Sequence, residues 1–505
     1  MSRLRKLAVS GIAAGLAMLL AACNAGAGTS ASSGGGGGLS TKTASIAFAL
    51  EPENLDFTRT DGAAIPQVLL TNVYEGLVEL DQDGKVVPLL AESWKVSADR
   101  KSYTFKLRQG VTFSNGAPFD ANTVKFSIER VKKDWTISLK KAMDVVEGVT
   151  VDSPTQVTVR LARPSNDWLF KMTTRIGVMM SPDGVADLAN KPVGTGPYVV
   201  GKWVRGDSIT LTARPGYWGT APYMSTVVFR YFKDPTASTN ALLSGGIDAI
   251  GNVAAPDSLI RFESDPTFKI IEGTSNGEVT LSMNNKSKAF GDKRVRQAVR
   301  YALNHKAILD TAWAGRGTLI GGPVPPTDPW YEDLTGLFPY DPQKAKDLLA
   351  EAGAANLTVR LRLPNVAYAV AAGQVVKSQL EDVGITADID VLEFPARWLD
   401  LVFNKHDYDM SIINHVEARD IANYANPDYY FGYDNPKVQR LIAAADAGTP
   451  AQQVRDLRAA ARQISEDAAA DWLFLFPYLV VARANLKGLP KNGISESFDV
   501  TGLSR

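Results

Sequence analysis

Residues 103–119 have the sequence YTFKLRQGVTFSNGAPF, and this stretch decides the fold class. Tyr103, Phe105 and Leu107 alternate with polar residues, which is typical of a β-strand with one buried face. Gly110 and Gly116 are expected to form turns, and residues 121–131 have the spacing of a helix. A strand followed by turns and a helix predicts mixed α/β structure.

The alternation of strands and helices continues in both directions along the chain. Further strands are predicted at residues 45–49, 77–80, 86–87, 149–161 (two strands around Ser153-Pro154), 279–283, 357–363, 385–392 and 472–482. Further helices are predicted at residues 64–74, 292–309, 341–349, 370–383, 438–445 and 452–469. The globular part, about 460 residues, exceeds what one hydrophobic core usually supports, so two or three lobes are expected.

The sequence argues against two classes of protein: general nucleic-acid binders, and proteins with a membrane-spanning helix beyond the N-terminus. The 505 residues carry 54 basic and 54 acidic side chains, without the basic excess of a general nucleic-acid binder. Beyond the N-terminus, the nearest approach to a membrane-spanning stretch is residues 472–482, which Pro477 interrupts. We therefore expect no nucleic-acid partner and a buried strand at residues 472–482.

The first 22 residues have the pattern of a secretory signal. Arg3, Arg5 and Lys6 precede an apolar run too short to cross a bilayer comfortably, and small residues lead to Cys23. LAAC at residues 20–23 resembles a bacterial lipobox, in which the thiol receives a diacylglycerol; the alternative is an ordinary signal with a chance cysteine. Cys23 is the only cysteine, so no disulfide can form. Residues 24–40, rich in Gly and Ser, predict a flexible tether with a reach of roughly 20–25 Å.

Several sequence blocks, in order along almost the whole chain, resemble one protein family. In these blocks the chain resembles the dipeptide/oligopeptide/nickel-type solute-binding proteins of ABC importers. These are the bacterial extracellular solute-binding proteins of family 5. The blocks are LAESW (90–94), residues 103–119, PVGTGPY (192–198), YW (217–218), ALLSGGIDA (241–249), MNN (283–285), residues 290–299 and YDPQKAKDLL (340–349).

The resemblance implies a two-lobed periplasmic-binding-protein-like α/β fold, with an extra subdomain on lobe I and interlobe crossover strands. Ligand would be enclosed between the lobes by hinge closure. The implied organisation is a signal peptide (1–22), a lipidated Cys23 with its tether (23–44), lobe I (45–275, with an inserted subdomain at about 81–190), lobe II (276–475) and a return to lobe I (476–505).

In oligopeptide-binding members of the family, a tryptophan and an aspartate close behind it hold the N-terminal end of the peptide. In this sequence His415 stands at the tryptophan position, and no aspartate falls in register. Glu417 and Asp420 are the nearest acids and the candidates to bind an amine, because a buried charge needs a partner. The alternative is that both acids pair with Arg419 on a solvated loop.

The candidate ligand-binding residues are His415, Glu417, Arg419 and Asp420 in this segment, and Trp398, Tyr74, Glu75 and Asn284 in other, less regular segments. We expect no cofactor and no metal site, because only His305 and His406 accompany His415 and no second cysteine is present. Residues 273–277 match the serine-hydrolase pattern G-x-S-x-G, but a strand is predicted after them where a nucleophile elbow needs a helix. The chain is therefore expected not to be an enzyme.

Two kinds of function remain open. The first is a lipid-anchored receptor on the outer face of the cytoplasmic membrane, a monomer that delivers an oligopeptide or similar solute to ABC permease subunits; a sugar or a metal chelate is an alternative ligand. The second is a receptor-shaped lipoprotein without a transport role that acts in cell-envelope assembly.

Overall fold

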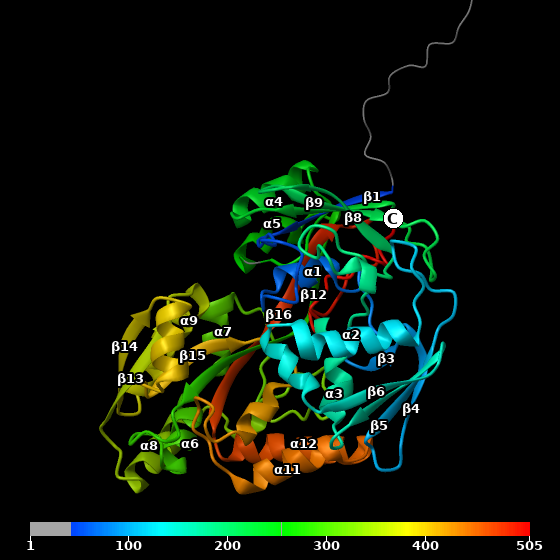
Figure 1. Ribbon diagram of the computed structural model, residues 1–505. Helices are drawn as coiled ribbons and strands as arrows, with labels where there is room; N and C mark the ends of the chain where they lie inside the picture. Colours follow the sequence, from blue (N-terminus) through cyan, green and yellow to red (C-terminus); the bar gives the residue numbers. More distant parts are fainter. Residues whose placement is uncertain (1–41, 254) are drawn as a thin grey trace, which may run out of the picture. The chain divides into compact units, whose positions relative to one another are not determined.

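The computed structural model describes residues 42–253 and 255–505, and its largest element is a mixed ten-stranded sheet (Figure 1). The strand order is β14-β13-β15-β12-β16-β11-β1-β10-β9-β8. Cys23, the signal and most of the tether lie outside the described residues. No helix in the described part of the chain is long and apolar enough to cross a membrane.

The predicted strands and helices are present, but the strands at Ala91–Val96, Tyr198–Val204, Ser208–Ala213, Thr226–Tyr231, Ala249–Ile250 and Met410–His415 were not predicted. The strands are β1 Thr43–Phe48, β2 Val78–Leu80, β3 Val86–Pro88, β4 Ala91–Val96, β5 Ser102–Leu107, β6 Val146–Ser153, β7 Gln156–Leu161, β8 Tyr198–Val204, β9 Ser208–Ala213, β10 Thr226–Tyr231, β11 Ala249–Ile250, β12 Phe268–Met283, β13 Leu357–Pro364, β14 Ile385–Leu392, β15 Met410–His415 and β16 Ala470–Arg483. The α-helices are α1 Ala64–Leu69, α2 Ala121–Asp134, α3 Asn166–Lys171, α4 Pro235–Ser244, α5 Ile260–Glu263, α6 Lys293–Ala302, α7 His305–Trp313, α8 Pro342–Glu351, α9 Ala367–Glu381, α10 Ala396–Trp398, α11 Pro436–Ala447 and α12 Pro450–Glu466.

Two helix predictions were wrong in extent. The single helix predicted for residues 292–309 is two helices, because the side chain of Asn304 accepts a hydrogen bond from the Ala307 N–H and caps a new helix there. The helix predicted for residues 64–74 ends at Leu69, and Leu70 has extended backbone.

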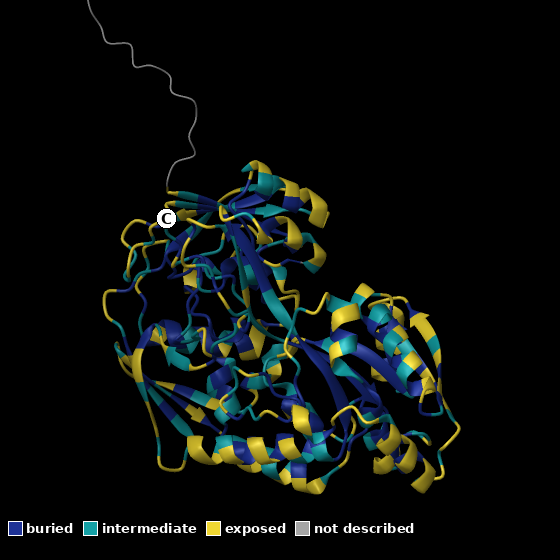
Figure 2. Ribbon diagram, turned by 180° about the vertical axis from the view of Figure 1, so that it is seen from behind, coloured by how far each residue is buried: buried dark blue, intermediate teal, exposed yellow. Residues whose placement is uncertain are grey.

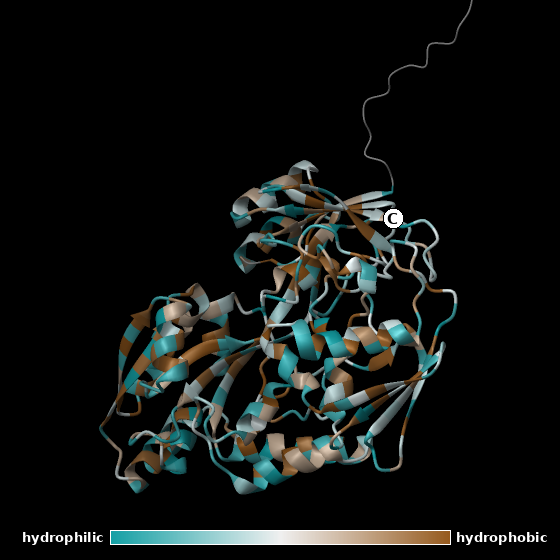
Figure 3. Ribbon diagram, viewed as in Figure 1, coloured by the Kyte–Doolittle hydropathy of each residue, from teal (hydrophilic) through white to brown (hydrophobic). Residues whose placement is uncertain are grey.

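The buried hydrophobic residues form four clusters, two in each lobe. Lobe I is built on residues 44–268, together with residues 479–503, which return to it. Lobe II has cores made only from residues 279–475. Figure 2 shows the central strands as largely buried, whereas the outer helices carry buried and exposed faces. Figure 3 shows polar and apolar residues along α11 and α12, as expected of helices with one face on the core.

Strands β12 and β16 run through both lobes and join them. They pair antiparallel from Phe268 to Thr274 in one stretch and again from Glu278 to Ser282 in the other. The pairing is irregular between Thr274 and Glu278, where Pro477 of β16 also lacks a backbone N–H. The change of lobe therefore coincides with the weakest part of the connecting ladder.

Lobe I carries an extra subdomain, in which the four-stranded sheet β4-β5-β7-β6 is packed with α2 and α3. Tyr103 of β5 is buried in its core, as the alternating pattern predicts. Gly194 must be glycine, because a Cβ there would lie 1.9 Å from the Val73 carbonyl oxygen. The glycine in PVGTGPY thus serves close backbone packing inside this lobe.

Candidate ligand-binding site

Three of the predicted site residues come together at the end of β15. His415 is the last residue of the strand, Glu417 lies on the loop that follows, and Asp420 begins a 3-10 helix (Asp420–Ala425). Each offers one potential ligand atom, and these atoms lie within 4.8 Å of one another. The loop between them contains Arg419 in a left-handed conformation (φ 60°), which is costly for a residue with a side chain.

Glu278 of β12 joins this group, although the sequence analysis did not single it out. It is the residue directly opposite His415 in the antiparallel pair, so both side chains leave the same face of the sheet. Glu278 is 3% exposed. Within the described residues, its carboxylate forms no hydrogen bond or ion pair, and only its backbone carbonyl accepts a side-chain donor, Thr280 Oγ1.

Burial and mutual repulsion shift the proton affinities of this group. Burial raises the pKa of Glu278 well above its ordinary value, and the charges of Asp420, Asp328 and Glu417 raise it further. Burial, with the charges of Glu417 and Asp328, raises the pKa of Asp420 to about 8. Burial lowers the pKa of His415 to about 4, so its imidazole is neutral at neutral pH, and its Nε2 lies 2.8 Å from the Tyr430 hydroxyl.

Arg419 forms no ion pair with Glu417 or Asp420 among the described residues, so the predicted pairing is wrong, although Glu417 is exposed as a solvated loop requires. Its guanidinium lies 3.6 Å from the ring centroid of Phe170 and 4.8 Å from that of Trp330. Its only acidic partner in the described residues is Asp328, with 4.0 Å between Nε and the carboxylate. Because Phe170 belongs to α3 of lobe I, Arg419 acts as a contact between the lobes.

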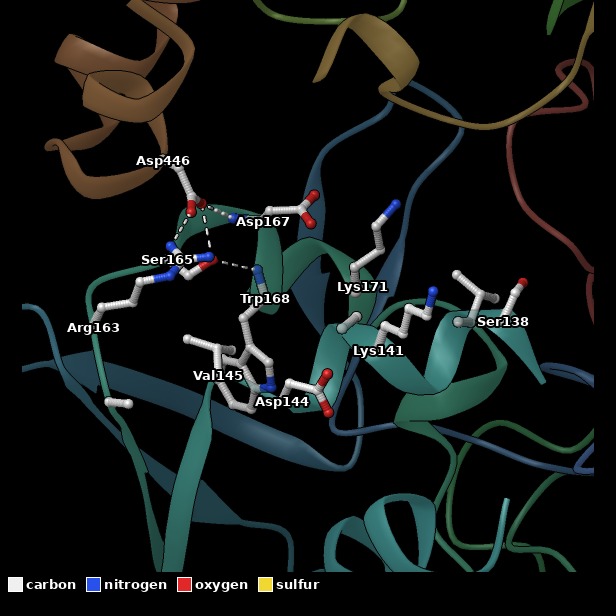
Figure 4. A pocket seen from close by; sticks show the side chains of 13 residues that line it. Ser138, Lys141, Asp144, Val145, Arg163, Ser165, Asp167, Trp168, Lys171 and Asp446 are labelled. Carbon is white, nitrogen blue, oxygen red and sulfur yellow. Dashed lines mark hydrogen bonds and ion pairs between the residues drawn. The ribbon is translucent and has the colours of Figure 1, made fainter. Parts of the chain in front are cut away.

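A second contact between the lobes is centred on Asp446 near the end of α11 (Figure 4). Its carboxylate accepts hydrogen bonds from Arg163 Nη1 (2.6 Å), Ser165 Oγ (2.8 Å) and the Asp167 backbone N–H (3.0 Å). Asn166 Nδ2 donates to the carbonyl oxygens of Ala445 and Gly448, both at 2.8 Å. The first turn of α3 is therefore fastened to the end of α11.

Two cavities flank this contact. One, of about 630 Å³, is lined by lobe I residues that include Lys141 and Lys171, with Asp446 at its edge (Figure 4). The other, of about 680 Å³, lies between Pro164 on one side and Trp330, Arg419 and Ile421 on the other. This second cavity is mostly apolar and is lined by both lobes, as expected for a site that closes over a solute.

The remaining predicted residues have partners inside one lobe. Glu75 is buried and accepts hydrogen bonds from Tyr217 Oη (2.6 Å) and Trp218 Nε1 (2.9 Å). Tyr74 Oη accepts the Val193 N–H at 3.1 Å.

On the lobe II side, Trp398 Nε1 donates to Ser411 Oγ at 3.0 Å, and Asn284 Nδ2 donates to the carbonyl oxygens of His406 and Tyr408. Neither residue joins the group around His415, although the Trp398 ring contacts Tyr430, the partner of that histidine.

By distance alone, His415, Glu417 and Asp420 could surround a small cation, although the sequence analysis expected no metal site. The expectation was based on the number of histidines and cysteines alone. It did not consider that carboxylates can complete a metal site around a single histidine. Ser275 of the G-x-S-x-G match lies within β12 and donates to the Phe476 carbonyl oxygen at 2.7 Å, so the strand–turn–helix geometry of a nucleophile elbow is not formed there.

Comparison with known proteins identifies the family. Residues 85–437 match the profile described as "Bacterial extracellular solute-binding proteins, family 5 Middle". The chain belongs to this family. Among curated proteins it is 30% identical over 337 residues to the glutathione-binding protein GsiB of Salmonella paratyphi A, a match that covers 65% of each chain. The chain thus spans about two thirds of the length of that relative.

Solved structures of family members share the fold. The DppA protein of Helicobacter pylori, in complex with the peptide STSA, superimposes with a TM-score of 0.75 at 22% identity, covering 92% of this chain and 98% of DppA. NikA of Brucella suis, in complex with Fe(III)-EDTA, gives a TM-score of 0.78 at 22% identity, covering 91% of this chain and 99% of NikA. The predicted two-lobed fold is confirmed, and these two proteins bind chemically different ligands, a peptide and a metal chelate.

Proposed function

We propose that this family 5 protein is a non-catalytic, lipid-anchored receptor of an ABC importer, which encloses a peptide or similar small solute between its lobes. One observation carries the proposal: two separately packed lobes are joined by β12 and β16, whose pairing is irregular where the chain changes lobe. Such a joint permits hinge closure. We propose that lobe I comprises residues 45–275 and 476–505 and lobe II residues 276–475, and the separation of the hydrophobic clusters supports these bounds.

The site geometry supports an organic solute with a positive group. A cavity lined by both lobes supplies apolar walls. At the end of β15, Glu417 and Asp420 form no ion pair with any described residue. They lie near this wall, since Arg419 and Ile421 line the cavity and flank Asp420 in the sequence. A peptide has an amine that these acids would bind. Glu417 and Asp420 are the residues that we propose for that amine.

Extracytoplasmic location and lipid anchoring belong to the same proposal. They depend on the signal pattern and on Cys23, and the family is described as extracellular. Permease subunits of an importer would be the protein partners, and we propose that the receptor acts as a monomer.

Ligand-induced compaction tests this function. Protein stripped of ligand under mild denaturation and refolded would be measured by small-angle scattering and thermal unfolding, with panels of peptides, sugars and nickel complexes. A true ligand should reduce the radius of gyration and raise stability by about 2.7 kcal/mol at 100 times its Kd. Native mass spectrometry of the unstripped protein would identify a co-purified solute. If no compound in any panel changes either observable, the receptor proposal is wrong.

A further inference from the structure

Glu278 is an unusual residue for a strand that joins two lobes. It is buried on β12, it lies opposite His415, and among the described residues its carboxylate forms no hydrogen bond or ion pair, whereas its backbone carbonyl accepts from Thr280 Oγ1. A buried carboxylate without a partner destabilises a protein, so a fold selected for stability alone would replace it. The cost points to an occupant that supplies the missing positive charge.

The charged groups that act on Glu278 are all acidic among the described residues. Asp420 and Glu417 approach from the segment after β15, and Asp328 approaches from the loop before Trp330. Two cations act on these acids: Arg419, which Asp328 and two aromatic rings already occupy, and Lys171 of α3, whose charge lowers the pKa of Asp420. His415 is neutral, and the hydroxyl of Tyr430 bonds to its ring.

We infer that Glu278, together with Glu417 and Asp420, binds the positive charge of a net-cationic organic solute, such as a peptide with a basic side chain or a polyamine, and disfavours anionic solutes. This inference rests on the proposed receptor function and specifies its substrate class. A single α-amine carries one positive charge, whereas the group offers three carboxyls; a ligand with additional positive charge leaves fewer of them unpaired. An anionic peptide would bring a further negative charge to the same place.

The position of Glu278 adds a consequence for closure. It is the first residue after the irregular segment of β12 and the first of that strand to pair with β15. A cation bound by Glu278 and by the acids after β15 would therefore link β12 to the loop that follows β15. That loop contacts lobe I through Arg419. Ligand charge and lobe closure would be coupled through these few residues.

Calorimetry with three matched tripeptides on ligand-stripped protein tests the inference. The probes are Ala-Lys-Ala, Ala-Ala-Ala and Ala-Glu-Ala, with spermidine and glutathione as additional cationic and anionic solutes. We expect Ala-Lys-Ala to bind about tenfold or more tightly than Ala-Ala-Ala, and Ala-Glu-Ala and glutathione to bind about tenfold or more weakly. In Glu278→Gln the advantage of Ala-Lys-Ala should fall below about threefold.

Glu272→Gln is the matched control, because Glu272 lies on the same strand and pairs with Arg316 at 3.1 Å, away from the acidic group. It should retain the wild-type preference. Asp420→Asn is the second test variant, should Glu278→Gln fail to fold, and it should also reduce the preference.

The possible failures are separable. If none of the five solutes binds, the peptide-receptor function itself is wrong. If the tripeptides bind without regard to charge, or if Glu278→Gln and Asp420→Asn keep the wild-type preference, only the cation inference is overturned. Binding of NiCl2 alone that is lost in His415→Ala and unchanged in Glu278→Gln would also overturn it, in favour of a metal ion held by His415.

Discussion

Asp446 and Arg163 are 283 residues apart in the chain and form an ion pair between the lobes, with 2.6 Å between Oδ2 and Nη1. The Arg163 side chain is 65% exposed, so the pair alone contributes little. Asp446 also accepts hydrogen bonds from Ser165 and the Asp167 backbone, and these bonds exist only when α3 and α11 touch. The carboxylate therefore stabilises the closed arrangement of the lobes.

Replacing this carboxylate should favour the open arrangement. Asp446→Ala is expected to destabilise the closed form by about 1–3 kcal/mol, since two or three hydrogen bonds are lost. Ligand affinity should fall about tenfold, and scattering should show a larger radius of gyration. Asp144→Asn is the control, because Asp144 lines the same cavity and belongs to lobe I alone. Wild-type affinity in Asp446→Ala would contradict a latch role.

Lowering the pH should destabilise the folded protein, because the buried His415 resists protonation. Burial lowers its pKa to about 4, from an ordinary value of about 6.5. Because the folded state binds the proton more weakly, the contribution of His415 to stability is present above pH 6.5 and is lost as pH falls towards 4. The loss approaches about 3 kcal/mol. Urea unfolding of wild type and His415→Gln across this range should show a difference that shrinks with acidification; a constant difference would contradict it.

Asp420 should have the opposite effect on the pH dependence of stability: it destabilises the folded protein as the pH rises. Its folded pKa of about 8 lies above the ordinary value of about 3.9, so its protonated form is favoured by folding. Its favourable contribution is complete below pH 3.9 and is lost as pH rises through 8. In the absence of ligand, Asp420→Asn should therefore gain stability relative to wild type as pH increases from 4 to 8. Unfolding curves at matched pH would check the slope, and a downward slope would refute the assignment.

A buried ion-pair network should be important for the stability of lobe II. Asp471 is fully buried and accepts a hydrogen bond from Arg300 Nε at 3.0 Å, while His305 Nε2 lies 2.9 Å away. Burial acts to raise the pKa of Asp471, but these two partners outweigh it and lower the pKa. Asp471→Asn leaves Arg300 buried without its counterion and should cost about 3–5 kcal/mol of unfolding free energy.

The exposed pair of Lys405 and Asp400 provides the comparison, and Asp400→Asn should cost less than about 1 kcal/mol. Chemical denaturation of both variants would measure the difference. Equal losses would mean that the buried network contributes no more than a surface pair.

Cys23 offers a prediction about location. If its thiol carries the lipid, Cys23→Ser should remove the protein from the membrane fraction or leave it unprocessed, since two acyl chains give stable anchoring. Membrane fractionation with mass spectrometry of the mature N-terminus would decide this. Normal processing with undiminished membrane association would exclude lipidation.

Local signals in the sequence predicted the longer helices and half of the ten-stranded sheet, but they missed β8, β9, β10, β11 and β15. The helix α8 begins where Asp341 caps it and Pro342 occupies its first turn, and Gly353 beyond its end has a φ of 68°. The strand β14 has the predicted bounds. The break at Asn304 was missed because the same apolar spacing continues across it, and only the capping hydrogen bond distinguishes one helix from two.

The candidate site was predictable only where its residues are neighbours in sequence. His415, Glu417 and Asp420 occupy one short segment, so a resemblance could locate them. Glu278 enters the group through strand register, and Asp446 meets Arg163 through the contact of two lobes; neither relationship leaves a local pattern. Glu278 alternates with the apolar residues Val279 and Leu281 and shares its face with Thr280 and Ser282, and this charged residue in a polar row was the one available sign of it.

The return of the chain to lobe I has a consequence for the order of folding. The cores of lobe II use only residues 279–475, a continuous segment, whereas lobe I needs Val480, Phe498 and Val500 to complete its core. During synthesis, which starts at the N-terminus, lobe II can complete its cores while lobe I still lacks its last strand. Lobe I must therefore hold exposed apolar surface until almost the last residue is available, and this interval is when the protein is most exposed to aggregation and proteolysis.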